Sequence, residues 1–304
     1  MMRLIAMRLL GGVGVLFVVA TMSFFILRAA PGGPFDTEAT QSVEARRNQE
    51  ARFGLDQPLA VQYKMFLGKL VTGTLQSNKR TQTVGELITE HVGYSATLGS
   101  LAMLFAVLFG TTLGVIAAWK RNTWLDHGLM STALIGISIP SFVLAPIFIL
   151  VFALQLRWLP AARATDFTSY ILPAVTLGMI YAGTVARLAR EGMIETLGQD
   201  FIRTAKAKGV GAPAMLVRHA LRIGVTPVVT YIAPALSALI TGSFVIEKIF
   251  QIPGLGFYFV ASVGDRDYEV LSGLLVFYVS LVVIANLIVD ILYGVLDPRV
   301  RSAR

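Results

Sequence analysis

The sequence contains no cysteine, and only 14% of its 304 residues are charged. The lack of cysteine excludes disulfides, thiolate metal sites and a cysteine nucleophile. A soluble domain of this length carries roughly a quarter of its residues as charged side chains. The low charge therefore argues against a soluble protein, and the mean hydropathy of +0.69 agrees with this.

Short motifs for nucleotide binding and hydrolysis are also missing. The single Gly-Lys pair, at residues 68–69, is not followed by Ser or Thr, so no phosphate-binding loop of the form G-x-x-x-x-G-K-S/T occurs. G-x-S-x-G and H-E-x-x-H are absent as well. The pattern places His91, His127 and His219 in three separate loops, without metal-ligand spacing. We therefore predict no catalytic residue, no metal site and no cofactor held by this chain.

Six stretches of the sequence carry no charge at all and are each about 20 residues long. A helix rises about 1.5 Å per residue, so about 20 residues cross a hydrocarbon core about 30 Å thick. Barrel strands would alternate in polarity, whereas these runs are uniformly apolar. The predicted fold class is all-α integral membrane with about six transmembrane helices, the first retained rather than cleaved as a signal peptide. The runs are residues 9–27, 93–119, 128–156, 167–186, 223–246 and 270–289.

The net charge of +8 could indicate a nucleic-acid partner, but its distribution follows the positive-inside rule. If the N-terminus is cytoplasmic, most Lys and Arg residues fall in inside segments. We expect both termini inside and residues 34–92 and 159–167 outside. The two shorter outside loops then hold only Arg157, Arg163, Lys248 and Arg266.

This topology divides the chain into consecutive parts. After the first span, the sequence APGGP ends the helix, and a mixed-polarity segment predicts a small extracytoplasmic subdomain of short helices. The parts are 1–28 as the first transmembrane helix, 29–92 as the loop subdomain, 93–297 as a core of five transmembrane helices with a charged cytoplasmic loop at 187–222, and 298–304 as a cytoplasmic tail.

The charged loop at 187–222 is predicted to form a helix, a turn and a second helix. The turn is GVGAP at residues 209–213, where Gly209 and Gly211 allow a tight turn. Pro213 suits the first position of the second helix. The first helix carries Arg187, Arg190, Glu191, Glu195 and Arg203.

The second helix of this loop is too short and too polar to span a membrane. Its spacing places Val217, Ala220 and Leu221 on one face, with Arg218 and Arg222 on another. One apolar face and one cationic face suit docking onto another protein or lying against lipid headgroups.

The segment RTAKAKGVGAPAMLVRHAL at residues 203–221 resembles the cytoplasmic EAA loop of ABC importer permeases. That motif reads E-A-A, three residues, G, nine residues, and then an apolar residue, any residue, L and P. His219 and Arg222 stand where the motif has the apolar residue and the proline, as in the variant of the peptide/nickel branch. The remaining motif positions are filled by Arg203, Thr204, Ala205, Gly209 and Leu221.

Segments along nearly the whole chain are similar to the B-type permeases of oligopeptide importers. The segments are MRLLGGVGVLFVVATMSFFILRAAPGGPFD, ARFGLDQPLAVQY, ISIPSFVLAPIFILVF, FIRTAKAKG, GSFVIEKIFQIPGLG, DRDYEVL and VLDPRVR. The stretch APGGPFD favours oligopeptide over dipeptide permeases.

This resemblance implies a type I ABC importer permease fold in the cytoplasmic (inner) membrane of a prokaryote. It implies a second homologous permease, two cytoplasmic ATPases that bind ATP and Mg, and an extracytoplasmic substrate-binding protein as partners. The EAA loop would form a coupling helix seated in a groove of an ATPase. The residues implied in coupling are Arg203, Thr204, Ala205, Gly209, Gly211, Pro213, Val217, Arg218 and Leu221.

Other functions remain open at this point. The charged loop at 187–222 could be an ordinary positive-inside segment or a DNA-binding helix-turn-helix. A DNA-binding motif is not expected, however, between two transmembrane helices. Relatives carry dipeptides, nickel chelates or glutathione, and a membrane receptor or scaffold without transport is a further alternative. We expect a translocation subunit, without enzyme activity and without a nucleic-acid partner.

The fifth span carries hydroxyl groups along one side. At about 100° per residue, these hydroxyls fall together on the helical wheel. The stripe either packs closely against another helix or lines the aqueous substrate route, and we favour the route. The stripe comprises Thr226, Thr230, Ser237 and Thr241, and the opposite flank comprises Val228, Ile232, Ala235 and Leu239.

Overall fold

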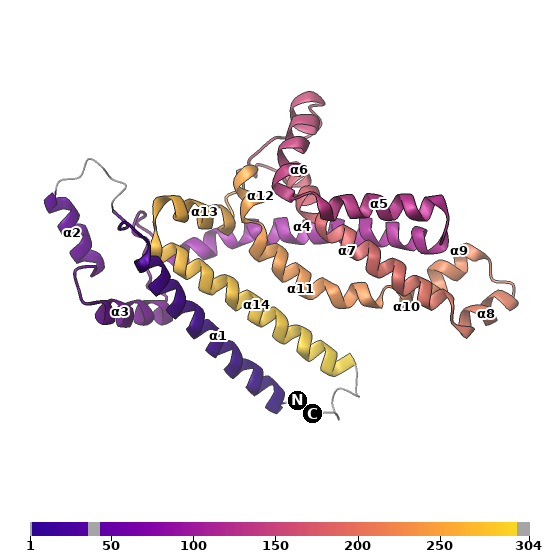
Figure 1. The fold of residues 1–304 in the computed structure, drawn as a ribbon, viewed down its shortest axis with the longest axis horizontal. Coiled ribbons are helices and arrows are strands. Elements are labelled where there is room, and N and C mark those ends of the chain that lie inside the picture. The colour runs from indigo at the N-terminus through magenta and orange to yellow at the C-terminus, as the bar shows by residue number, and fades with distance from the viewer. Residues whose placement is uncertain (1, 36–42, 297–304) are drawn as a thin grey trace. The chain divides into compact units, whose positions relative to one another are not determined.

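The computed structural model describes residues 2–35 and 43–296, and these form helices joined by short loops (Figure 1). Within these ranges no strand occurs, apart from an isolated bridge between Gln76 and Thr83. The predicted all-α class is confirmed. The helices are α1 Met2–Ala29, α2 Val43–Phe53, α3 Leu59–Thr72, α4 Val84–Trp119, α5 Trp124–Ser138, α6 Ser141–Phe148, the π-helix η1 Ile149–Gln155, the 3₁₀ turn η2 Phe167–Tyr170, α7 Ile171–Leu197, α8 Asp200–Ala207, α9 Ala212–Ala214, the π-helix η3 Met215–Ala220, α10 Leu221–Gly224, α11 Thr226–Gly242, α12 Phe244–Ile249, α13 Leu255–Asp265 and α14 Tyr268–Leu296.

Among residues 2–35 and 43–296, four helices are long and apolar enough to cross a membrane unaided. They are Ala6–Ala29, Val84–Trp119, Phe167–Leu197 and Tyr268–Ile288. Two bent pairs of helices also meet this length and composition test when each pair is taken together. They are Trp124–Ser138 with Ser141–Gln155, bent by 102°, and Ala212–Gly224 with Thr226–Thr241, bent by 50°. Counting each bent pair as one span gives six, in agreement with the prediction of about six.

Proline chemistry explains both bends. α5 ends at Ser138, and Ile139 takes an extended backbone conformation because a residue before proline is pushed out of the helical region. Pro140 then precedes the first residue of α6. The run 128–156, predicted as one span, is therefore broken near its middle. The second bend lies at Val225, where Pro227 occupies the first turn of α11 and can donate no backbone hydrogen bond.

The second span begins nine residues earlier than the charge-free run at 93–119 indicated, at Val84. A capping box formed by Thr83 and Glu86 marks the start of α4. The backbone N–H of Thr83 donates to Glu86 Oε2 at 2.7 Å, and the N–H of Glu86 donates to Thr83 Oγ1 at 3.2 Å. The polar first turns of α4 therefore belong to the same helix as its apolar part.

Packing groups the described chain into two compact units. One unit comes from residues 1–94 and 253–304, and the other comes from residues 95–252. The first holds α1 to α3, the start of α4, α13 and α14, so the short helices after α1 pack with the first and last long apolar helices. This grouping by contact differs from the division by topology expected from the sequence, which follows chain order.

In the first unit, α1 and α14 pack side by side and antiparallel (Figure 1). They approach so closely that a Cβ built on Gly12 would lie 2.6 Å from Val283 Cγ1. At one end of the pair, Arg28 Nη2 lies 3.5 Å from Glu269 Oε1, and both side chains are at most 15% exposed. The hydroxyl of Tyr268 donates to a loop carbonyl, that of Gly32, at 2.8 Å.

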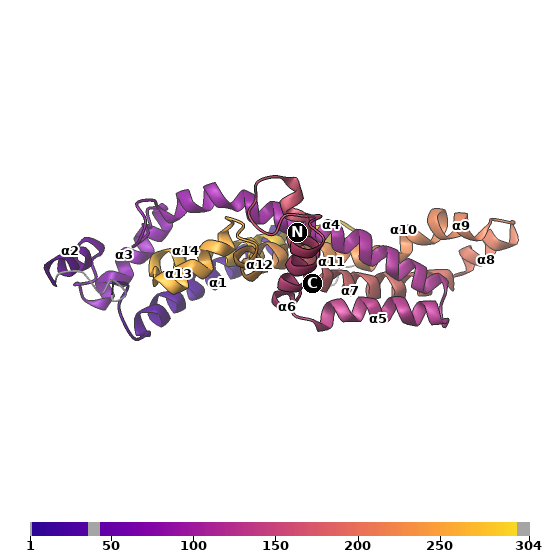
Figure 2. The same cartoon turned by 90° about the horizontal axis from the view of Figure 1, so that it is seen from above.

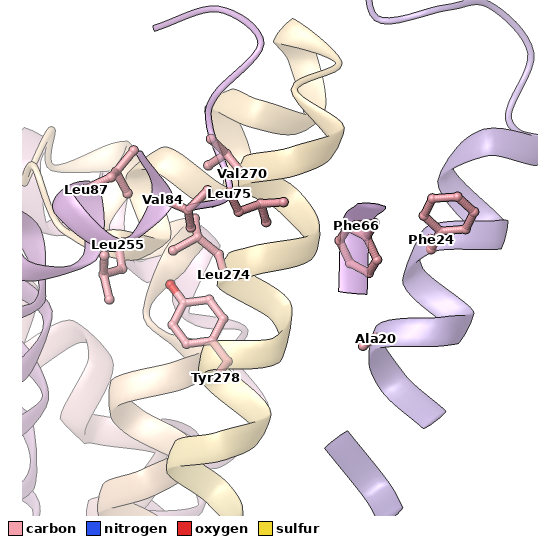
Figure 3. Close-up of a cluster of buried hydrophobic side chains, with 10 residues drawn as sticks. All are labelled: Ala20, Phe24, Phe66, Leu75, Val84, Leu87, Leu255, Val270, Leu274 and Tyr278. Atoms are coloured by element: carbon pink, nitrogen blue, oxygen red, sulfur yellow. The ribbon is translucent and has the colours of Figure 1, made fainter. Parts of the chain in front are cut away.

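The core of this unit joins these spans to the short helices of the loop subdomain (Figure 3). Phe24 of α1 and Phe66 of α3 lie with ring centroids 5.3 Å apart. Leu75 and Val84 converge on Leu274 of α14. The segment predicted to contain short helices holds α2 and α3, and the buried side chains of α3 share one core with α1 and α14.

In the second unit, α7 is the central helix, and it packs against α4, α5 and α10 through glycine. A Cβ built on Gly114 of α4 would collide with the carbonyl oxygen of Ala186. A Cβ on Gly183 would collide with the carbonyl oxygen of Ala133 on α5. Small residues allow such close backbone approach between membrane helices, where lipid offers no hydrophobic driving force.

Candidate functional site

The loop predicted at 187–222 forms a projecting structure, which we call the coupling arm and define as α8 to α10, Asp200–Gly224. In Figures 1 and 2, α8 and α9 lie beyond the turn that joins α4 to α5, at the same end of the second unit. The predicted order of helix, turn and helix is present. The first helix, however, is not continuous.

The first helix of the predicted loop, which was expected to run through Arg203, is interrupted between Leu197 and Asp200. α7 continues from the fourth span to Leu197, so Arg190 belongs to the span, and Arg203 lies on the separate helix α8. The N–H of Gly198 bonds the carbonyl of Glu195 at 3.1 Å, which is the tightened bonding of a helix end. The sequence prediction of one helix through Arg203 is thus wrong, because Gly198 ends the helix there and Asp200 favours a new N-terminus.

The turn of the arm depends on Gly209, whose φ of +80° lies in the left-handed region. The backbone N–H of Gly209 donates to the carbonyl of Lys206 at 3.0 Å. The backbone N–H of Val210 donates to the carbonyl of Ala205 at 3.2 Å. Gly211 has φ −63° and ψ 149°, which any residue adopts. The expectation that both glycines make the turn therefore holds for Gly209 only.

After the turn, Pro213 lies in the first turn of α9 but is its second residue, one position later than predicted, because the helix begins at Ala212. The chain then winds as the π-helix η3, and this rotates the side chains relative to α-helical spacing. Leu216 and Ala220 are buried, whereas Val217 is 65% exposed. The face predicted from Val217, Ala220 and Leu221 is thus split, with Val217 turned outward.

A small apolar cluster holds the two sides of the arm together. Ile202 of α8 and Leu216 of η3 pack with Met193 of α7 and Ala118 of α4. Ala205 is also buried, and Leu221 is half-buried. These two residues of the predicted coupling set therefore support the arm from within.

The rest of the predicted coupling set lies on the outer surface of the arm. These exposed residues combine cations, backbone-accessible glycines and one large apolar side chain, Val217. Such a surface can dock onto another protein through a central apolar contact with charged groups around it. The exposed members are Arg203, Thr204, Gly209, Gly211, Pro213, Val217 and Arg218.

The hydroxyl stripe of the fifth span lies on α11. The hydroxyls of Thr230 and Ser237 donate to carbonyls of their own helix, at 2.9 and 3.1 Å, and Thr241 does the same at 2.9 Å. These three residues are half-buried, and Thr226 is exposed. Within this chain, the stripe is therefore the less covered side of α11.

The opposite flank of α11 is the side that packs. Val228, Ala235 and Leu239 are buried, with exposed fractions of 4% or less. Val228 contacts Val185 and Ala189 of α7. The described part of this chain thus uses the apolar flank, not the stripe, as its packing seam.

The histidines lie on helices rather than in the loops that the sequence indicated. His91 is on α4, where its Nδ1 lies 2.9 Å from the carbonyl oxygen of Pro253 and its ring lies 4.2 Å from that of Tyr258. His127 is on α5, and His219 is on η3. Among residues 2–35 and 43–296, no group of three or more His, Asp and Glu residues has a metal-binding arrangement.

Sequence reasoning missed two buried carboxylates with arginine partners. Asp126 of α5 is 1% exposed and bonds Arg190 of α7. Asp267, before α14, accepts from Ser77 and lies 3.8 Å from Arg80 Nη1. Both pairs join residues far apart in the chain, so no local pattern indicates them.

Two family models match this sequence. Residues 110–302 match the model described as "Binding-protein-dependent transport system inner membrane component". Residues 1–98 match that of "Binding-prot-dependent transport system membrane comp, N-term".

Several known proteins are similar to the chain over nearly its whole length. The "Oligopeptide transport system permease protein OppB" of Haemophilus influenzae is 41% identical, over 99% of this chain and 100% of its own. The protein of the same name from Escherichia coli is 40% identical over the same shares. The "Dipeptide transport system permease protein DppB" of Bacillus subtilis is 42% identical, over 94% of each chain.

A solved structure shares the fold. It is described as "Crystal structure of an amino acid ABC transporter with histidines" and matches with a TM-score of 0.51 and 13% identity, over 70% of this chain and 94% of that one. At this identity the likeness concerns the fold alone. It agrees with the permease fold that the sequence indicated.

Proposed function

Because the chain belongs to the family of binding-protein-dependent transport system inner membrane components, we propose that it is the membrane-spanning permease subunit of an ATP-driven importer of oligopeptides. The observation that carries this proposal is the coupling arm. It is a compact extension of the central helix α7, with an exposed apolar residue among cations. Relatives named as peptide permeases align along almost all of the chain.

The energy for transport is proposed to come from partner subunits. The sequence has no phosphate-binding loop of the Walker type. Two cytoplasmic ATPases would bind ATP and Mg and receive the arm in a surface groove. A second homologous permease would complete the route, and an extracytoplasmic binding protein would deliver the substrate.

Packing and charge together support the proposed orientation. α1 and α14 are antiparallel neighbours, so the start of α1 and the end of α14 share one end of that pair (Figure 1). An even number of membrane spans would also leave both termini on the same side of the membrane. With the positive-inside bias, this supports cytoplasmic termini in the inner membrane of a prokaryote.

The substrate class rests on the relatives and on the stripe of α11. The oligopeptide and dipeptide permeases have nearly the same sequence identity to this chain. Sequence identity alone therefore does not distinguish an oligopeptide cargo from a dipeptide cargo. The matches to the oligopeptide permeases extend over the full length of those proteins. Neutral hydroxyls at Thr230 and Ser237 would offer weak hydrogen bonds without a charge that traps a zwitterionic peptide.

Purification of the tagged chain from its native membrane tests the proposed assembly. We expect it to copurify with a second permease and with ATPase subunits, and to hydrolyse no ATP when isolated from them. Competition between oligopeptides, dipeptides, nickel chelates and glutathione for uptake then tests the cargo. An active homo-oligomer of this chain alone, or a receptor that signals without uptake, would contradict the proposal.

A further inference from the structure

Asp126 is a buried acid beside the turn between α4 and α5. It lies in the first turn of α5, where the hydroxyl of Thr123 accepts from its backbone N–H. Its carboxylate accepts two parallel bonds from Arg190 of α7, from Nε at 2.7 Å and from Nη2 at 2.8 Å. The N–H of Asn122 adds a third bond to Oδ2 at 2.9 Å. These three hydrogen bonds to the carboxylate fix the geometry of the pair.

The burial of this pair makes it costly to break. The Asp126 side chain is 1% exposed and that of Arg190 is 25% exposed. Removal of one partner would leave an uncompensated charge in a poorly solvated site. A fork of two N–H groups on a carboxylate also restricts orientation in a way that a point charge does not.

Arg190 lies on α7, the helix that leads into the coupling arm, ten residues before the arm starts at Asp200. Arg190 precedes the end of α7 at Leu197 by about two helical turns. A Cβ built on Gly114 of α4 would lie 2.9 Å from the backbone nitrogen of Arg190, and one on Gly192 would collide with the carbonyl oxygen of Gly224. α10, which ends the arm, therefore packs tightly on α7 within one turn of Arg190.

We propose that Asp126 and Arg190 are positioning residues that fasten the base of the coupling arm to the α4–α5 turn. Movement of the arm would then be passed to α4, α5 and α7 as one body. Without the pair, the arm would move on its own, and ATP would be hydrolysed without transport. This inference rests on the proposed function of the arm.

The first test uses the complete complex in proteoliposomes, with Asp126→Asn. We expect ATP hydrolysis to persist while peptide uptake per ATP falls about tenfold, the size of a typical coupling effect. The double variant Asp126→Arg with Arg190→Asp restores the pair in reverse and should regain part of the uptake. Arg121→Gln, an exposed cation in the same turn, is the matched control and should leave the ratio unchanged.

A second readout does not depend on transport. The chain has no native cysteine, so Arg121→Cys and Lys206→Cys can carry spin labels on the α4–α5 turn and on α8. In the assembled complex, Asp126→Asn should broaden the distance distribution between the labels. An unchanged distribution would overturn the positioning role, even if the complex transports. A broadened distance distribution would support the positioning role, even if the cargo or the energy source differs from that proposed.

The inference also fails if Asp126→Asn loses hydrolysis and uptake in proportion while the complex remains assembled. It fails equally if uptake per ATP is unchanged in Asp126→Asn.

Discussion

Gly209 is the residue of the coupling arm whose backbone most restricts substitution. Its φ is +80°, and a Cβ at this position would meet no atom within 4 Å. A side chain there would therefore strain the backbone rather than clash. An L-residue in the left-handed region costs roughly 1–2 kcal/mol, and asparagine tolerates it better than a β-branched residue.

We predict that Gly209→Val lowers the population of the native turn by about 5- to 30-fold, which corresponds to this strain. Transport-linked ATP hydrolysis by the purified complex should fall, while the chain still inserts in the membrane. Gly209→Asn, the matched control, should keep most of the activity. Equal activity in the two variants would show that the left-handed turn is not needed for coupling.

Residues of the site were predictable from the sequence where a local pattern marks them. Gly209 and Pro213 follow from turn chemistry. Gly209 occupies the expected turn, and Pro213 lies one position later in its helix than expected. Asp126 and Arg190 stand 64 positions apart, so only the packing of α5 on α7 brings them together. Val217 was placed on the wrong face because π-helical winding is not visible in residue spacing.

At the scale of elements, α11 is the helix whose two sides were best predicted. Three of the four residues of the expected apolar flank are buried, and the fourth, Ile232, is half-buried like most of the hydroxyl stripe. Periodicity works here because α11 is regular through Pro234. The charge-free runs predicted the other helices less closely. The run at 128–156 hides the break between α5 and α6, and α4 begins with polar turns before its apolar run.

The stripe gives a prediction about solvent access in the assembled complex. Cysteines at Thr230 and Ser237 should react with a small hydrophilic thiol reagent, and turnover should change their rates. Cysteines at Ala235 and Leu239 should stay unreactive, since these positions are 4% and 0% exposed. If all four remain silent in every state, the stripe packs against the second permease and the route lies elsewhere.

At the scale of the whole molecule, the proposed topology assigns α3 and the coupling arm to opposite sides of the membrane. α3 would face the binding protein outside the cell, and the coupling arm would face the ATPases inside. Lys64 on α3 and Ala212 at the start of α9 are both exposed, so a cysteine at either can be labelled.

We predict that an impermeant thiol reagent added to whole cells labels Lys64→Cys and not Ala212→Cys. The charge asymmetry of the loops is the physical reason. After permeabilisation, both should be labelled, which controls for access. Labelling of Ala212→Cys alone in intact cells would invert the topology and remove the arm from the ATPases.

The central claim is that this chain provides the membrane passage through which partner ATPases drive peptides inward. The direct measurement is uptake of a labelled oligopeptide by proteoliposomes that contain the complete complex and the binding protein, with ATP on the side of the coupling arm. We predict accumulation that requires ATP and stops when this chain is omitted or when a non-hydrolysable analogue replaces ATP. Accumulation that is equal without ATP, or equal without this chain, would contradict the account.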